Sequence, residues 1–358
     1  MEPDQLTVHF EEEFIIGYDE STPDDYLADP LEIRTDQNGM IYIPDSYTSI
    51  KVYDAEGSFQ HQIGRSGDGP GEFRRISAIE INGQNELITF DSNRRHITRF
   101  SDAGNVLETQ LAERETMVWP EYSRQISENR YLLLRKPRET PEGGDEQLQF
   151  QSSVMHLFDS TFENRIASFG HIDSLMNQNA EFASLYPQHF GAGHFWPGEN
   201  GDIWYAPGLY DGRIFRFQEN SGGWSMNQTI RGHVIPQQPV VDVDYGAEGS
   251  LIVNMYNGSG VISYRGKVHS ESLGVFTLND GRLIHFSSQL DEGERRTLIE
   301  VFSSEGELEG VGRLEEFTFA GSEAGALIGS FWKDEEDRFY FIDNQNVPIV
   351  RVGRIEGI

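Results

Sequence analysis

Residues 64–106 read GRSGDGPGEFRRISAIEINGQNELITFDSNRRHITRFSDAGNV, and this stretch decides the fold. Three runs rich in Ile, Phe and Thr occur in it, ISAIEI (76–81), ELITFD (86–91) and HITRFS (96–101), separated by short turn segments. β-Branched and aromatic runs bounded by Gly, Asn and Asp are typical of strands. The stretch therefore predicts consecutive antiparallel strands joined by tight turns.

The same unit recurs along the chain, because a polar turn precedes a β-type run six times. These runs are MIYIPD (40–45), ELITFD (86–91), YLLLRK (131–136), IWYAPG (203–208), RLIHFS (282–287) and RFYFID (338–343). Each is followed by an alternating run: SIKVYD (49–54), HITRFS (96–101), SVMHLFD (153–159), RIFRFQ (213–218), TLIEVFS (297–303) or PIVRVG (348–353). In five copies a tight turn and a further strand come next. The repeat predicts six sheets of similar build.

The two ends of the chain complement each other. The sixth copy stops at Ile358 without its outer strand, and the N-terminal segment supplies an orphan strand, LTVHFEEEFII (6–16). Pairing these ends closes a circular array and removes exposed sheet edges. We therefore predict an all-β fold, a six-bladed β-propeller with four-stranded blades, in which the N-terminal strand closes the last blade.

The predicted boundaries lie within a single domain of residues 1–358. They are 6–16 for the closing strand, 31–64, 73–111, 121–170 and 190–230 for blades 1 to 4, 231–269 for an inserted flap, and 270–314 and 325–358 for blades 5 and 6.

Residues 64–106 resemble an NHL repeat. The resemblance is carried by the Gly-rich linker GDGPGEF (67–73), by the strand that ends at Asp91, and by the run and turn that follow it. Blade 1 (YIPDSYTSIKVYDAEG, 42–57) matches well, and blade 6 keeps YFIDNQN (340–346). The chain is similar to six-bladed propellers of the NHL and TolB-like type, many of them exported bacterial proteins. The resemblance implies the fold and names no ligand.

The composition limits the partners. The 28 basic and 59 acidic residues give a formal net charge of −31, and residues 1–30 carry ten carboxylates and no Lys or Arg. Such a charge disfavours nucleic acid and anionic lipid as partners. The chain has no cysteine, which excludes disulfides and thiolate chemistry. No apolar run approaches the ~18 residues of a membrane span.

Export is the expected localisation, in the periplasm, at the cell surface or in the medium. Met1 followed by Glu2, Pro3 and Asp4 reads like a start placed after a removed leader, and a lipid anchor upstream is compatible with it. The acidic charge fits such a setting.

The two faces of the predicted propeller differ in loop length. Turns between first and second strands and between third and fourth strands are short, such as DQNG (36–39) and AEG (55–57). Longer segments lie on the other face, and 231–269 is the longest, with SLIVNMY (250–256) and GVISYRG (260–266) predicting a hairpin flap. Because variable loops on a rigid scaffold usually carry binding, we expect the long-loop face to be the working surface.

Histidines and aromatic residues gather in the segments expected around the mouth of the channel on that face. Aromatic platforms with a few polar groups are typical of sugar and small-molecule sites. The candidate ligand-binding residues are Trp119, Tyr122, Tyr186, His189, His194, Trp196, His233, Tyr256, Arg265 and Trp332. The expected partner is a glycan, a peptide or another protein.

A metal centre is the second hypothesis. His171, His189, His194 and His233 fall within 63 residues and could hold Zn²⁺ or Fe²⁺, as in propeller lyases that the fold resembles. Their spacing is not diagnostic, so solvated histidines remain the simpler interpretation. Calcium at the axis is a further option, without assigned ligands. Asp45, Asp91 and Asp343 end strands and are expected to accept backbone N–H bonds.

No catalytic motif emerges from the sequence. There is no Gly-x-Ser-x-Gly elbow, and a strand rather than a helix follows the glycines 67, 69 and 71, which disfavours a phosphate-binding loop. We therefore expect a non-enzymatic binding propeller, with a metal-dependent lyase or hydrolase as the alternative. Metal analysis distinguishes the two hypotheses.

Overall fold

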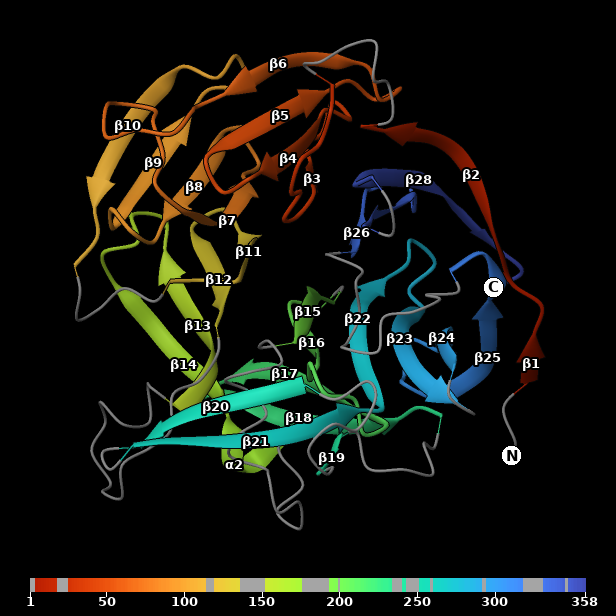
Figure 1. Cartoon of the computed structure of the whole chain (residues 1–358). Helices are drawn as coiled ribbons and strands as arrows, with labels where there is room; N and C mark the ends of the chain where they lie inside the picture. The colour runs from red at the N-terminus through yellow and green to blue at the C-terminus, as the bar shows by residue number, and fades with distance from the viewer. Residues whose placement is uncertain are drawn as a thin grey trace.

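A computed structural model gives the architecture of the chain. It describes residues 4–17, 25–113, 119–135, 152–175, 193–198, 200–233, 240–242, 251–257, 260–291, 294–317, 331–344 and 347–358; within 240–268 only the backbone is described. Six antiparallel sheets follow one another around a central axis (Figure 1). The predicted six-bladed β-propeller is confirmed.

Each blade has four strands, counted outward from the axis. Blade 1 has β3 (Arg34–Thr35), β4 (Ile41–Asp45), β5 (Ser49–Tyr53) and β6 (Phe59–Ile63). Blade 2 has β7 (Ile76–Ile81), β8 (Leu87–Asp91), β9 (His96–Phe100) and β10 (Val106–Leu111). Blade 3 has β11 (Tyr122–Ser127), β12 (Arg130–Leu134), β13 (Ser153–Asp159) and β14 (Arg165–His171).

The second half of the chain repeats this order. Blade 4 has β15 (His194–Pro197), β16 (Ile203–Ala206), β17 (Arg213–Asn220) and β18 (Gly223–Arg231). Blade 5 has β22 (Ser270–Thr277), β23 (Leu283–Asp291), β24 (Glu294–Phe302) and β25 (Leu308–Leu314). Blade 6 has β26 (Phe331–Lys333), β27 (Phe339–Asp343) and β28 (Ile349–Glu356) from the C-terminal segment. Two short helices, α2 (Ile172–Leu175) and the 3₁₀ turn η1 (Glu315–Phe317), complete the described elements.

The N-terminal segment closes the ring, as predicted. β2 (His9–Ile16) runs antiparallel to β28 as the outer strand of blade 6, with Phe10 opposite Ile355 and Ile16 opposite Val350 (Figure 1). Two ion pairs join these strands, Arg351 to Glu12 at 2.5 Å and Arg354 to Glu13 at 3.0 Å.

One detail of the predicted closing strand is wrong. It was expected to be continuous over 6–16, but the chain leaves the sheet after Leu6, and β1 (Asp4–Leu6) pairs in parallel with β25 of blade 5. β1 can pair with β25 because two residues of β25, Gly310 and Gly312, have no side chain. The side chains of Leu6 and Val8 fill the space that these glycines leave. The N-terminal segment therefore ties two blades together.

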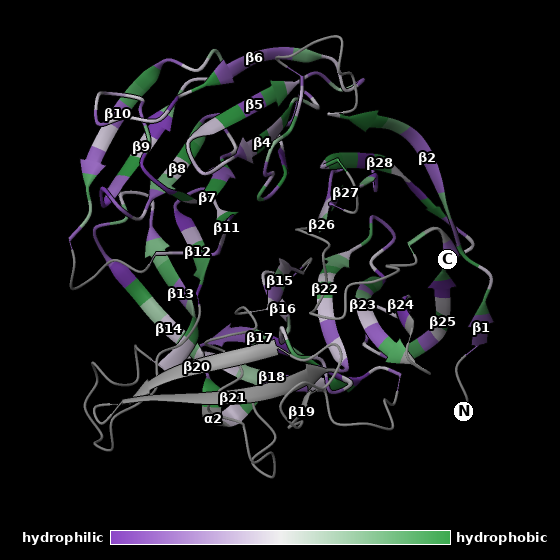
Figure 2. Ribbon diagram, in the orientation of Figure 1, coloured by the Kyte–Doolittle hydropathy of each residue, from purple (hydrophilic) through white to green (hydrophobic). Residues whose placement is uncertain are grey.

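Apolar side chains hold neighbouring blades against each other. The second strands β4 and β8 are buried along their whole length, whereas the outer strand β10 is almost entirely exposed. Figure 2 shows hydrophobic residues along the strands of the blades with hydrophilic residues between them. This gradient follows from the fold, since a second strand has a neighbouring strand on both sides and a packed sheet on each face.

The segment between blades 4 and 5 forms a small sheet of its own. β19 (Val240–Asp242), β20 (Leu251–Asn257) and β21 (Gly260–Val268) are ordered β19-β21-β20, and β20 and β21 pair as the predicted antiparallel hairpin. Its role as a flap stays a prediction. No helix in the described part of the chain is long and apolar enough to cross a membrane.

The seam between β2 and β28 can be tested at Gly353. A Cβ at this position would lie 2.1 Å from the carbonyl oxygen of Glu11, so the two strands approach too closely for any side chain. We expect Gly353→Ala to lower the free energy of unfolding in urea by about 2 kcal/mol, the usual cost of forced overpacking.

Gly83→Ala is the matched control for this substitution. Its Cβ would meet only the side chain of Gln125, at an ordinary distance of 3.6 Å. An equal loss of stability in both variants would contradict the close-packed seam.

Candidate functional site

The innermost strands of all six blades meet at a pocket of about 590 Å³ on the axis. Its lining comes from residues 34–37, 80–83, 124–125, 196–198, 277–279 and 332–335. Five blades contribute the end of the first strand and the turn that follows, and blade 3 contributes Arg124 and Gln125 from within β11. The pocket therefore opens on the face that carries the short turns, opposite to the long-loop face.

One residue of each innermost strand occupies the same position in its blade. In every blade the ladder pairs this residue with one that lies eight positions later in the second strand. The six equivalent residues, here called the central ring, are Arg34, Glu80, Arg124, Trp196, Phe276 and Trp332. Five of them line the pocket and form its floor. Half of the central ring is charged and half is aromatic.

Contacts among its members hold the central ring together. The guanidinium carbon of Arg34 lies 4.6 Å from the ring centroid of Trp332, and that of Arg124 lies 3.7 Å from Trp196. Trp196 packs edge-on against Phe276 at 4.9 Å and against Trp332 at 5.3 Å. Cation–π contacts of this kind are worth about 2 kcal/mol or more when they are shielded from water. The aromatic half thus holds both guanidinium groups in place.

Buried carboxylates balance Arg34. Its side chain is fully buried, with the Nη2 atom 2.8 Å from Glu32 and the Nε atom 3.5 Å from Glu80. Burial raises the pKa of Glu32 to about 7, although the neighbouring Arg34 opposes the shift. Burial likewise raises the pKa of Glu80, again against the pull of Arg34. Two carboxyl groups with raised pKa values therefore flank one guanidinium below the pocket.

Arg124 differs from Arg34 in its polar contacts. Within the described part of the chain its guanidinium makes no hydrogen bond and no ion pair within 4 Å, and the Nη1 atom is buried without a partner. Its closest contacts are the faces of Trp196 and Trp332. A guanidinium that is held on aromatic rings and has free donors is suited to bind an oxyanion.

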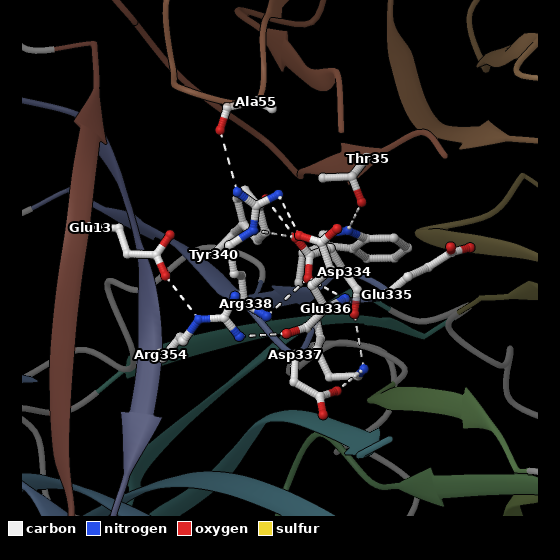
Figure 3. Close-up of polar contacts among 12 residues, drawn as sticks. Glu13, Thr35, Ala55, Asp334, Glu335, Glu336, Asp337, Arg338, Tyr340 and Arg354 are labelled. Atoms are coloured by element: carbon white, nitrogen blue, oxygen red, sulfur yellow. Dashed lines mark hydrogen bonds and ion pairs between the residues drawn. The ribbon is translucent and has the colours of Figure 1, made fainter. Parts of the chain in front are cut away.

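Polar side chains at the ends of the first strands shape the rim. Asp36, Asn82 and Asp334 are equivalent, and each accepts backbone N–H bonds from residues two and four positions later at 2.8–3.0 Å. Asp334 also accepts bonds from Arg338 and Tyr340, as Figure 3 shows. These three side chains fix the turns and are not free to bind a ligand.

Hydrogen bonds connect these turns from blade to blade around the rim. Donor and acceptor pairs are Gln37 to Asn85, Gly83 to Gln125, Thr277 to Pro197, Asn279 to Asp337, Arg338 to Ala55, and Trp332 to Thr35. The last two contacts appear in Figure 3. They join blade 6, whose outer strand β2 closes the ring, to blade 1. The bond to Thr35 also positions Trp332 of the central ring.

The predicted ligand-binding residues divide into three groups. Trp196 and Trp332 line the pocket, and the ring of Tyr122 covers Arg34 at 4.4 Å. Trp119 packs against the apolar cluster between blades 2 and 3, away from the pocket lining. Tyr186 and His189 lie outside the described residues, and only the backbone is described for Tyr256 and Arg265.

Of the four candidate metal-ligating histidines, His189 lies outside the described residues, and the other three do not gather. His171 bonds to Ser152 at 2.6 Å, and the Nε2 atom of His194 lies 3.1 Å from the carbonyl oxygen of Ser272. Burial lowers the pKa of His194 to about 4. His233 is exposed. Among the described residues no three His, Asp or Glu side chains are placed to hold a metal ion.

Asp45 and Asp91, two of the strand-ending aspartates, accept backbone N–H bonds. Asp91 accepts backbone N–H bonds from Asn93 and Arg94 in the turn that follows, as predicted. Asp45 instead accepts them from Ala28 and Asp29, in the segment that leads into blade 1. These bonds anchor the connections between blades.

Sequence reasoning missed Arg34, Arg124 and Lys333 as pocket residues. The signal was present, because counting eight residues back from the second strands locates the central ring. The long-loop face stays a prediction, since much of it falls in 136–151, 176–192, 234–239, 243–250 and 318–330, outside the described residues.

The fold and the axial pocket define a six-bladed β-propeller with a pocket at its short-turn mouth. Residues 9–155 match a family model described as DUF5128, 6-bladed beta-propeller. No curated protein matches the chain.

Solved structures resemble the whole chain at low identity. One is a DUF4221-family protein of Bacteroides vulgatus, with a TM-score of 0.59 and 10% identity, covering 99% of this chain and 100% of that one. Another is a Bacteroides fragilis protein described as a candidate exported protein, with a TM-score of 0.55 and 11% identity, at the same coverage. These similarities show the fold alone.

The raised pKa of Glu32 predicts a pH dependence of stability. Its carboxyl group binds a proton more tightly in the folded protein, with a pKa of about 7, than in the unfolded chain, where the ordinary value is 4.5. The free energy of unfolding therefore falls as the pH rises from 4.5 to 7, by at most about 3 kcal/mol from this group.

Glu32→Gln removes this titration and should flatten the profile in urea denaturation between pH 4.5 and 7. Glu335→Gln, at the exposed rim of the pocket, is the control and should leave the slope unchanged. Profiles of equal slope in wild type and Glu32→Gln would contradict the assigned protonation.

Proposed function

We propose that the axial pocket is a non-enzymatic binding site that holds a small carboxylate-bearing sugar, free or at the end of a glycan. The observation that carries the proposal is Arg124, whose guanidinium lies in the pocket with a buried Nη1 atom and no hydrogen-bond partner among the described residues. A carboxylate can accept two parallel bonds from such a group.

Most other charged groups of the pocket already have partners, and Glu335 lies at its exposed rim. Asp36 and Asp334 cap turns, and Glu80 accepts the backbone N–H of Gln125 and lies beside Arg34. Lys333 donates to Asp337 at 2.5 Å. Arg124 is therefore the charged group left to engage a ligand deep in the pocket.

The rim adds polar groups of the kind that sugar hydroxyls bind. Gln37, Gln125 and Asn279 line the pocket with side-chain amides, which both donate and accept hydrogen bonds. A volume of about 590 Å³ is within the range of small-ligand sites. Together these features support an acidic sugar over a purely apolar ligand.

The choice of mouth departs from the predicted long-loop surface. A glycan, peptide or protein partner on that surface stays a prediction, as does the alternative of a metal-dependent lyase or hydrolase built on its histidines. Export is the proposed localisation, supported by the net charge of −31.

Isothermal titration with glucuronate and galacturonate tests the proposal. We expect both acids to bind, and glucose and galactose to bind at least tenfold more weakly, because a hydrogen-bonded ion pair contributes roughly 1.5–3 kcal/mol. Arg124→Met keeps a long apolar side chain on Trp196 and should weaken binding of the acids about tenfold or more.

Arg130→Met is the matched control, because Arg130 lies in the same blade but pairs with Glu219 at 2.7 Å, away from the pocket lining. It should leave the affinity unchanged. Equal affinity for acidic and neutral sugars, no binding at all, or an unaffected Arg124→Met variant would contradict the proposal. If a peptide that ends in a free carboxylate bound more tightly than the acidic sugars, the ligand of the pocket would be a peptide and not a sugar.

A further inference from the structure

Blade 5 carries a second polar site, away from the lining of the axial pocket. Ser272, His285 and Glu300 come from the adjacent strands β22, β23 and β24, and the ladder places His285 directly opposite Glu300. His285 and Glu300 have no exposed surface, and Ser272 is 6% exposed. Three neighbouring strands thus bring a hydroxyl, an imidazole and a carboxylate into one line.

The distances in this line are those of hydrogen bonds. The Oγ atom of Ser272 lies 2.9 Å from the Nε2 atom of His285, and the Nδ1 atom of His285 lies 2.7 Å from the Oε2 atom of Glu300. This is the order of contacts of a serine nucleophile, its general base and the carboxylate that orients the base.

The surroundings fix where the protons lie. Glu300 also accepts bonds from the hydroxyl of Tyr210, at 2.7 Å, and from the backbone N–H of His233. Burial raises the pKa of Tyr210 well above its ordinary value, so Tyr210 keeps its proton. With these donors on Glu300, the geometry places the Nδ1 atom of His285 to donate to the same carboxyl group. The Nε2 atom is then free to accept the Ser272 proton.

Blade 5 buries several polar side chains beside its apolar core. Leu273 and Phe276 belong to the apolar cluster that the blade shares with its neighbours. The same blade also buries Ser270, Ser272, His285 and Glu300. The ladder has a bulge between Ser272 and Gly274, a feature that re-aims side chains near active sites. A buried polar network costs free energy that an apolar contact would not.

We propose that Ser272, His285 and Glu300 form an acyl-transfer site that hydrolyses esters of small acyl groups. The Oγ atom of Ser272 forms a bond to the acyl carbon while its proton moves to the Nε2 atom of His285. The ester C–O bond then breaks, and the leaving alcohol takes the proton from His285. Water, deprotonated by His285, then attacks the acyl carbon of the acyl-serine. The bond from that carbon to the Oγ atom breaks, the Oγ atom takes the proton back from His285, and the carboxylic acid is released.

The small acyl group follows from the limited exposure of Ser272. With 6% of its surface accessible, this side chain admits an acetyl-sized group rather than a long chain. The site is separate from the axial pocket, because none of its three residues lines that pocket. The two proposals therefore stand or fall independently.

The absence of cysteine from the whole chain allows a direct test of the nucleophile. Ser272→Cys introduces a single thiol beside the imidazole of His285, which should lower the pKa of that thiol. We expect iodoacetamide to alkylate it at pH 6 at least about tenfold faster than the thiol introduced by Ser270→Cys. Ser270 is the matched control, because it is buried on the same strand and its Oγ atom has no hydrogen-bond partner among the residues that the structure describes.

Wild-type protein provides the second measurement, which requires no substitution at the site. A small fluorophosphonate should label Ser272, as located by peptide mapping, and p-nitrophenyl acetate should be hydrolysed in excess of the Ser272→Ala variant. His285→Gln, where it folds with an unchanged circular dichroism spectrum, should lose the labelling. An unlabelled wild type together with an unreactive Ser272→Cys thiol would overturn the proposal and leave a purely structural network.

Discussion

The pairing of β2 with β28 is the constraint on which the rest of the structure depends. It joins the first described segment of the chain to the last blade, and β1 extends the contact to blade 5. Closure places the six innermost strands around one axis, so equivalent positions in six blades meet. The central ring exists only because each blade delivers one side chain to the same level, and the axial pocket exists only because the central ring provides its floor.

The chemistry of the central ring follows from what the axis can tolerate. A central ring of six apolar side chains would fill the axis but offer no group to bind a ligand. A central ring of six charged side chains would bury charges that lack partners. Arg34 is stabilised by Glu32, Glu80 and two aromatic rings, and its position between Trp332 and Tyr122 holds these rings in turn. Arg124 is left with aromatic neighbours and free donors, which makes it the group that recognises a ligand.

Much of the fold could be predicted from the sequence because its signals are local. Polar turns and alternating strands recur with each blade. The extra strand near the N-terminus and the missing outer strand of the sixth copy together indicated closure of the ring. The break after Leu6 was not visible, since it depends on Gly310 and Gly312 in another blade. Loop length predicted binding on the long-loop face, whereas the pocket lies on the short-turn face. No single short turn stands out in the sequence, and the pocket forms only where the turns of several blades meet. Ser272, His285 and Glu300 were missed for a similar reason, as three strands of one sheet, rather than one motif, bring them together.

Native-state hydrogen exchange tests the closed ring most directly. The account predicts that the amides of β2 and β28 exchange with the same free energy as those of β12, the second strand of blade 3, because all three belong to one cooperative unit. Exchange of the β2 amides through a separate opening, about 2 kcal/mol or more below that of β12, would contradict it. The N-terminal segment would then be an accessory strand, and the inner strands would meet at the axis without it.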